Sequence, residues 1–120
     1  MNARYIYLAV LLALTLAGCT EDEKYVNLGD DFVLFRLHGG VSVEDWKATN
    51  GGIPPEIVSL GFDSKHIVAD STTNGTTNVW VIIKTGRLVV GPMSSDAFKL
   101  YSTQTNREVL KIHLKNVWDY

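Results

Sequence analysis

From residue 32 onward the chain is built of short apolar runs whose period is mostly two. Residues 41–43 and 57–62 follow this period, residues 32–37 and 79–83 are apolar at nearly every position, and turn residues rich in Gly, Pro, Ser and Asn separate the runs. A period of two places alternate side chains on one face of a strand, whereas an amphipathic helix needs a period near 3.6. The sequence therefore predicts a mainly β domain of the α+β class, with a small antiparallel meander sheet.

Local patterns refine this prediction. Residues 79–83 are apolar on both faces, which is typical of a central strand. Residues 84–87 predict a hairpin connection to a strand at 88–90, which Gly91-Pro92 should end. Residues 71–78 are all Ser, Thr, Asn or Gly, and we expect them to form a loop.

One short helix is predicted near the C-terminus. Ser94 or Ser95 can cap residues 96–101, and the helix should end by residues 103–106.

Residues 109–117 fit two structures. Apolar residues alternate there with basic ones, which favours a strand, but a helix would also collect apolar residues on one face.

Composition limits the function classes. A chain of 120 residues makes one small domain, and its 11 basic and 13 acidic residues lack the positive excess of a nucleic-acid binder. A single Cys excludes an intramolecular disulfide and a four-cysteine zinc site. We expect no cofactor and no nucleic-acid partner.

The N-terminus has the pattern of an export signal. Residues 1–4 carry one positive charge, and residues 5–17 are apolar or aromatic except for Thr15. This run is too short to cross a bilayer, which needs about 20 helical residues. Residues 1–18 are therefore interpreted as a signal peptide. The alternative is a buried N-terminal helix or a short membrane anchor.

The end of this run, Leu16-Ala17-Gly18-Cys19, resembles the lipobox of bacterial lipoproteins. The resemblance implies cleavage between Gly18 and Cys19, a diacylglycerol on the Cys19 thiol, and an added acyl chain such as palmitate on the new amino terminus. Such a protein is exported and anchored to the cell membrane or to the outer membrane through Cys19. By the same resemblance, Thr20 does not signal retention at the inner membrane.

Residues 19–31 are rich in acids and are expected to form a tether between the lipid and a domain at residues 32–120. Within the tether, a strand is plausible only for residues 25–28.

Few residues point to catalysis or metal binding. His38, His66 and His113 have no His or Cys partner at ligand spacing, so we expect exposed or structural roles and no metal site. Adjacent acids, as in Glu44-Asp45, point to opposite faces of a strand. The motifs of common hydrolases and nucleotide-binding proteins do not occur. A pair of carboxyl groups brought together by folding remains an open alternative.

Three tryptophans are candidates for ligand contact. Trp80 lies in an apolar run and is expected in the core. Trp46 and Trp118 stand beside charged residues, so they are the possible surface aromatic contacts for a sugar or a peptide. Core packing is the favoured role for the set as a whole.

Four segments are similar to an uncharacterised family of small bacterial lipoproteins. They are residues 28–32, 53–69, 79–83 and 91–94, of which 53–69 reads Ile-Pro-Pro-Glu-Ile-Val-Ser-Leu-Gly-Phe-Asp-Ser-Lys-His-Ile-Val-Ala. His66 stands where the family more often has an aromatic residue. The resemblance supports the lipoprotein architecture and implies no catalytic residue, since the family has no assigned activity.

These observations favour a non-enzymatic, membrane-anchored module that binds an envelope protein or glycan. The alternatives are a small envelope hydrolase acting on cell-wall carbohydrate and a purely structural lipoprotein. A pocket of roughly 300 Å³ or more that holds two acids or a His–acid pair would favour the hydrolase. An exposed aromatic patch without such a pocket would favour binding.

Overall fold

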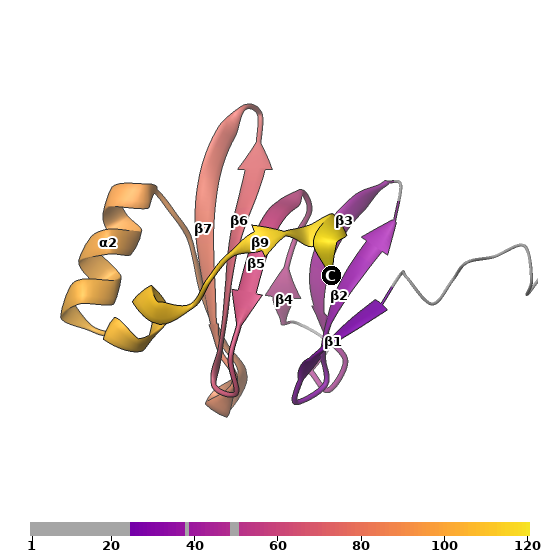
Figure 1. The fold of residues 1–120 in the computed structure, drawn as a ribbon, viewed down its shortest axis with the longest axis horizontal. Helices are drawn as coiled ribbons and strands as arrows, with labels where there is room; N and C mark the ends of the chain where they lie inside the picture. Colours follow the sequence, from indigo (N-terminus) through magenta and orange to yellow (C-terminus); the bar gives the residue numbers. More distant parts are fainter. Residues whose placement is uncertain (1–24, 38, 49–50) are drawn as a thin grey trace, which may run out of the picture.

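The computed structural model describes residues 25–37, 39–48 and 51–120. Within these ranges the chain forms two antiparallel sheets and one α-helix, arranged in three layers (Figure 1). The mainly β fold with a helix near the C-terminus is confirmed. The strands divide between two sheets, however, where the sequence predicted a single meander.

Sheet A has the order β1 (Tyr25–Gly29), β2 (Phe32–Leu37), β3 (Gly40–Asp45) and β4 (Gly52–Ile53). Sheet B has the order β8 (Leu88–Met93), β7 (Thr76–Ile83), β6 (His66–Thr73), β5 (Ile57–Phe62) and β9 (Lys115–Asn116). The helical segments within the described ranges are α2 (Ser95–Gln104) and the 3₁₀ turns η2 (Thr85–Arg87), η3 (Arg107–Lys111) and η4 (Val117–Asp119).

The main core lies between the two sheets. Phe32 and Leu34 of β2 and Ile67 and Ile82 of sheet B are fully buried there. A second core lies between sheet B and the segment containing α2 and η3, and it includes Val68, Val79, Val81 and Val109. Sheet B is therefore covered on both faces, which explains why β7 is apolar on both sides.

The predicted helix cap is confirmed at Ser94. Its side chain accepts a hydrogen bond from the Ala97 backbone N–H at 3.1 Å, and Asp96 lies in the first turn of α2.

The polar stretch 71–78 is not a loop, so that prediction is wrong. β6 and β7 continue through it in register to Thr73↔Thr76, and Asn74-Gly75 forms a tight turn with positive φ at both residues. Threonine is a good strand former, and an Asn-Gly pair suits a two-residue hairpin turn. Strand β8 likewise continues past Pro92, because it lies at the sheet edge and tolerates a missing N–H.

The strand favoured for residues 109–117 is also wrong over most of its length. Residues 107–111 form η3, and only Lys115–Asn116 pairs as β9, against β5. Val109 packs into the second core, and the chain then crosses sheet B. Residues 107–111 therefore turn toward that core as η3 and do not extend as a strand. The crossing is close at Gly61, where a Cβ would collide with the His113 backbone carbonyl.

The domain begins earlier than predicted. Residues 25–29 form β1 and pair with β2, for example Tyr25 with Phe35, so they are not part of a tether. Leu28 is fully buried in the main core. Residues 1–24, with the predicted signal peptide and the rest of the tether, lie outside the described residues.

Two basic side chains connect the sheets at one end of the core. The Lys84 ammonium donates hydrogen bonds to the backbone carbonyls of Leu28 in sheet A and Asp63 in the β5–β6 turn. The Arg87 guanidinium forms an ion pair with the buried Asp45 carboxylate and donates to the Asp30 carbonyl at 2.7 Å. Burial lowers the pKa of Lys84, whereas the Arg87 hydrogen bond lowers that of Asp45 despite burial.

Acid is expected to weaken the contact between the sheets. The folded-state pKa of Asp45 lies below its ordinary value of 3.8, so its stabilising contribution is complete above that value. The contribution disappears as the pH falls through the folded-state pKa, because the unfolded chain then binds the proton more readily. Urea midpoints measured from about pH 6 to pH 2 should therefore fall at the acid end. Asp45→Asn should have a lower urea midpoint at neutral pH, and its midpoint should fall less steeply as the pH is lowered. If the midpoints of the two proteins fall equally steeply with pH, the Asp45–Arg87 pair is not the source of the acid sensitivity.

Candidate functional site

The outer face of sheet A is the strongest candidate site. The strand register places Tyr25 opposite Phe35 and Asn27 opposite Val33 on this face. It also places Glu44 opposite Val33, again on the outer side. The inner-facing neighbours Phe32 and Leu34 enter the main core, so β2 is apolar on both sides.

Three aromatic rings cover part of this face. The Tyr25 ring centroid lies 5.0 Å from that of Phe35 and 5.5 Å from that of Trp46. Tyr25 and Trp46 remain 46% and 58% exposed. We call Tyr25, Phe35 and Trp46 the aromatic patch. Contiguous exposed aromatic surface of this kind marks interaction sites.

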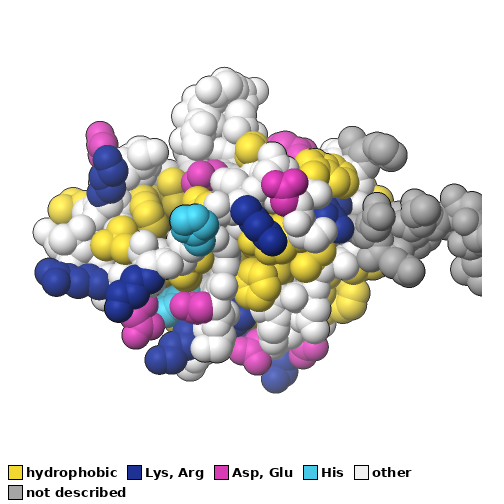
Figure 2. All heavy atoms as spheres, in the orientation of Figure 1, with side chains coloured by type: hydrophobic (Ala, Val, Ile, Leu, Met, Phe, Trp, Pro, Cys, Tyr) yellow, Lys and Arg dark blue, Asp and Glu magenta, His cyan; other side chains and the backbone are white. Residues whose placement is uncertain are grey.

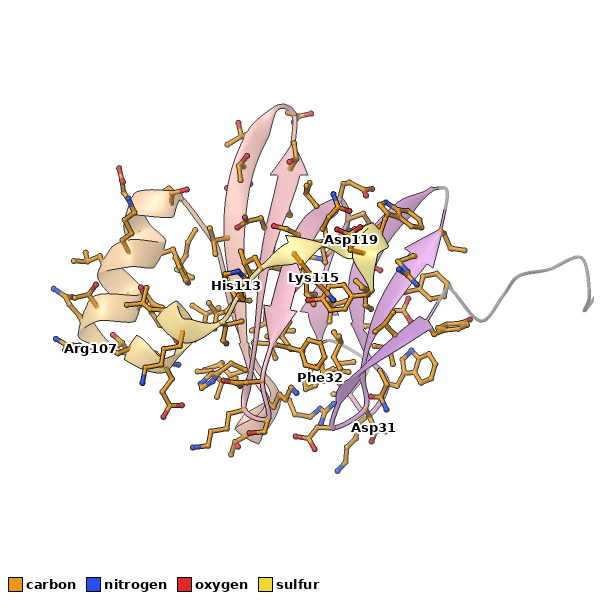
Figure 3. All side chains as sticks on the ribbon, in the orientation of Figure 1. Asp31, Phe32, Arg107, His113, Lys115 and Asp119 are labelled. Atoms are coloured by element: carbon orange, nitrogen blue, oxygen red, sulfur yellow. The ribbon has the colours of Figure 1, made fainter. Side chains whose placement is uncertain are left out.

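A pocket of about 240 Å³ opens beside the patch and is lined by Tyr25, Asn27, Asp31, Val33 and Trp46. The Asp31 carboxylate forms no hydrogen bond with the described residues. Figure 3 shows Asp31 at the tight turn between β1 and β2, with Phe32 next to it between the sheets. The pocket thus combines two ring walls with one carboxylate and one side-chain amide.

Hydrogen bonds fix the polar and aromatic groups of the pocket. The Asn27 carbonyl Oδ1 accepts from the Gly29 N–H at 2.9 Å. The Trp46 indole Nε1–H donates to Glu44 Oε1 at 2.9 Å, and the Trp46 backbone N–H donates to the Asp31 carbonyl at 2.9 Å. The turn after Trp46 is held by Asp45, which accepts from the Lys47 and Ala48 backbone N–H groups.

The three tryptophans occupy different surroundings. Trp46 belongs to the pocket. Trp118 is 57% exposed but lies in the C-terminal segment, where the Arg36 guanidinium stands 5.6 Å from its ring centroid. Trp80 is half-buried against the main core and donates to Ser71 Oγ at 2.8 Å.

A second aromatic surface lies where the C-terminal segment crosses the molecule. Figure 2 shows hydrophobic side chains around a basic one on this face. Phe62 and Tyr120 lie there, with Lys115 Nζ 4.3 Å from the Tyr120 ring centroid. Tyr120 donates to the Leu60 carbonyl, and Arg36 donates to the Val117 and Tyr120 carbonyls. These contacts fasten the C-terminus across the open end of the core, so this surface has a structural role.

The two described histidines, His66 and His113, do not line the pocket. His66 is buried, with Nε2 at 3.1 Å from Asn106 Nδ2 and Nδ1 at 3.3 Å from Asp63 Oδ1. His113 is exposed on the segment leading to β9, and His38 lies outside the described residues (Figure 3). No group of three or more His, Cys, Asp or Glu side chains in the described chain could hold a metal ion.

The acids of the described residues do not converge in the pocket. Glu44 and Asp45 point to opposite faces of sheet A, as predicted, and Arg87 pairs with Asp45 on the inner face. Asp30 and Asp31 lie in the turn between β1 and β2. Asp31 is the single carboxylate among the five pocket residues.

Sequence reasoning singled out Trp46 but missed Tyr25 and Phe35. Tyr25 was assigned to the tether, and Phe35 was assigned to a strand without a functional role. The sequence did carry one indication of this face: residues 32–37 are apolar at nearly every position, so β2 has apolar side chains on its outer side as well as its inner side.

Comparisons with known proteins identify no relative of this chain, since no protein-family model, curated protein or solved structure matches it. Within residues 25–37, 39–48 and 51–120, no helix has the length and apolar character needed to span a membrane. Cys19, Gly18 and Thr20 lie outside the described residues.

Proposed function

We propose that this protein is an exported, lipid-anchored module of the bacterial cell envelope that binds a partner through the outer face of sheet A. The partner is an envelope protein or glycan, and the module catalyses no reaction. The observation that carries the proposal is the aromatic patch at Tyr25, Phe35 and Trp46, with its adjoining pocket.

The contrast between β2 and β7 supports a binding role for this face. Both strands carry apolar side chains on both sides. The second side of β7 is covered by α2 and η3, whereas no layer of the described chain covers the outer side of β2. A strand buried on both faces is normally apolar throughout, so the composition of β2 suits a sheet whose outer face is covered by a partner.

The sequence supports the anchor. The apolar run at residues 5–17 and the lipobox-like ending at Cys19 favour export and lipidation, and Thr20 is compatible with the outer membrane. Tyr25 follows Cys19 by six residues, so the patch would lie within about 20 Å of the lipid even with the connection fully extended. Membership of the small lipoprotein family is likewise a proposal, resting on residues 28–32, 53–69, 79–83 and 91–94.

The pocket favours binding over hydrolysis. Glycoside hydrolysis uses two carboxyl groups about 5–10 Å apart, and Asp31 is the only carboxylate among the five residues that line this pocket. The His66–Asp63 pair belongs to the β5–β6 hairpin of sheet B and not to the pocket lining. A purely structural lipoprotein, the other alternative, would leave the aromatic patch uncovered in the cell.

Site-specific photo-crosslinking in intact cells tests the proposal. A benzophenone-bearing phenylalanine analogue in place of Phe35 should give a covalent adduct, and adding Trp46→Ala should greatly reduce it. The same analogue in place of Trp118, which is more exposed than the half-buried Phe35, should give no adduct. No adduct at position 35, or equal adducts at both positions, would contradict binding through sheet A.

A further inference from the structure

We propose that the pocket beside Tyr25 and Trp46 binds a neutral sugar ring of an envelope glycan. This inference rests on the proposed function and specifies the ligand of the same face. Its basis is the combination of two ring walls, a hydrogen-bond acceptor and hydrogen-bond donors in one shallow pocket.

The ring walls suit a pyranose. Its C–H groups form a flat apolar face that packs against an aromatic ring, and Trp46, a residue that is 58% exposed, offers such a ring. The Tyr25 ring stands at 68° to it, with 5.5 Å between the centroids, and forms a second wall. The two rings form a corner of the pocket, whose volume of about 240 Å³ has room for one sugar ring and leaves the rest of the glycan outside.

The polar groups match hydroxyls. The Asn27 Oδ1 is already used by the Gly29 N–H, so the amide offers its N–H₂ donors. Asp31 offers an acceptor with no hydrogen bond in the described chain, and the Tyr25 hydroxyl can donate or accept. A sugar hydroxyl both donates and accepts, so it can satisfy both kinds of group at once.

Charged ligands fit the same groups less well. An anion would be repelled by Asp31, and Glu44 adds a second negative charge next to Trp46. An organic cation would be attracted by Asp31 and by the ring faces. It would also meet the Asn27 N–H₂ donors, whose partial positive charge opposes it, so the donor set favours the neutral ring.

Titration of the full-length lipidated protein in detergent micelles tests the ligand class. The probes are three neutral trisaccharides (tri-N-acetylchitotriose, cellotriose and maltotriose), together with choline and trilysine as cations, followed by saturation-transfer NMR. At least one trisaccharide should bind saturably with a Kd of about 1 mM or below. Trp46→Ala should weaken binding about tenfold, since it removes the stacking wall. Trp118→Ala should leave it within about twofold, because it lies outside the pocket.

A sugar ring of this kind could belong to peptidoglycan or to a neutral glycolipid. A second series of binding experiments distinguishes these two sources, using isolated peptidoglycan and vesicles that contain a neutral glycolipid. Saturable binding to either, lost in Trp46→Ala, supports the proposal. Failure of every saccharide probe at about 10 mM, preferential binding of choline or trilysine, or binding unaffected by Trp46→Ala would overturn it. If the sugar probes fail while the Phe35 position still crosslinks to a protein, the proposed function stands and this inference fails. If both experiments fail, both are wrong.

Discussion

Replacing Phe32 with alanine is expected to lower the free energy of unfolding by about 3–5 kcal/mol. The Phe32 side chain is completely buried between the two sheets, so its removal leaves a cavity lined by both of them. The Arg87 guanidinium lies 4.2 Å from the ring centroid and loses that contact as well. A small domain has only about 5–15 kcal/mol of stability in total, so the variant should be close to unfolding.

Urea denaturation followed by circular dichroism measures this effect. The matched control is Leu110→Ala, which removes a similar apolar group that is more than half exposed, and it should cost less than about 0.5 kcal/mol. If Phe32→Ala costs less than about 1 kcal/mol, the packing of the two sheets around β2 is wrong.

Replacing Cys19 with alanine is expected to abolish lipid attachment completely. The thiol is the group to which the lipid would be joined, and alanine offers no nucleophile in its place. Incorporation of an alkyne-tagged palmitate, detected on a gel after coupling to a dye, should fall to background. The protein should also change its gel mobility, because the signal peptide is retained or the released chain lacks lipid.

Thr20→Ala serves as the control for Cys19→Ala, since it alters the neighbouring residue and should still take up the label. Unchanged labelling and mobility in Cys19→Ala would refute the lipoprotein interpretation. That result would not change the description of the folded domain, because its first strand, β1, begins at Tyr25, six residues after Cys19.

The fold class could be predicted because period-two patterns report directly on strands. The apolar run at residues 79–83 correctly indicated a central strand, since its two sides meet two different cores. The division into two sheets could not be predicted, because it depends on which faces pack together. Residues 71–78 were misassigned because backbone pairing, and not apolar burial, extends that hairpin. Residues 107–111 were misassigned because the burial of Val109 overrides the local alternation.

The candidate site was predicted only in part. Trp46 and Trp118 have the same kind of charged neighbours in sequence, so sequence alone could not tell which one belongs to a binding face. The structure separates them by their contacts: Trp46 lies beside Tyr25 and a pocket, whereas Trp118 stands over Arg36. Tyr25 and Phe35 are assembled by the pairing of β1 with β2, and that register is a property of the folded sheet.

The most direct test of the account is hydroxyl-radical footprinting of the two exposed tryptophans. Trp46 and Trp118 are 58% and 57% exposed, so in the purified protein they should oxidise at similar rates. In intact cells, oxidation of Trp46 should fall severalfold relative to Trp118 if a partner covers the outer face of sheet A. An unchanged ratio of Trp46 to Trp118 oxidation between purified protein and cells would contradict the claim that this face is the binding surface.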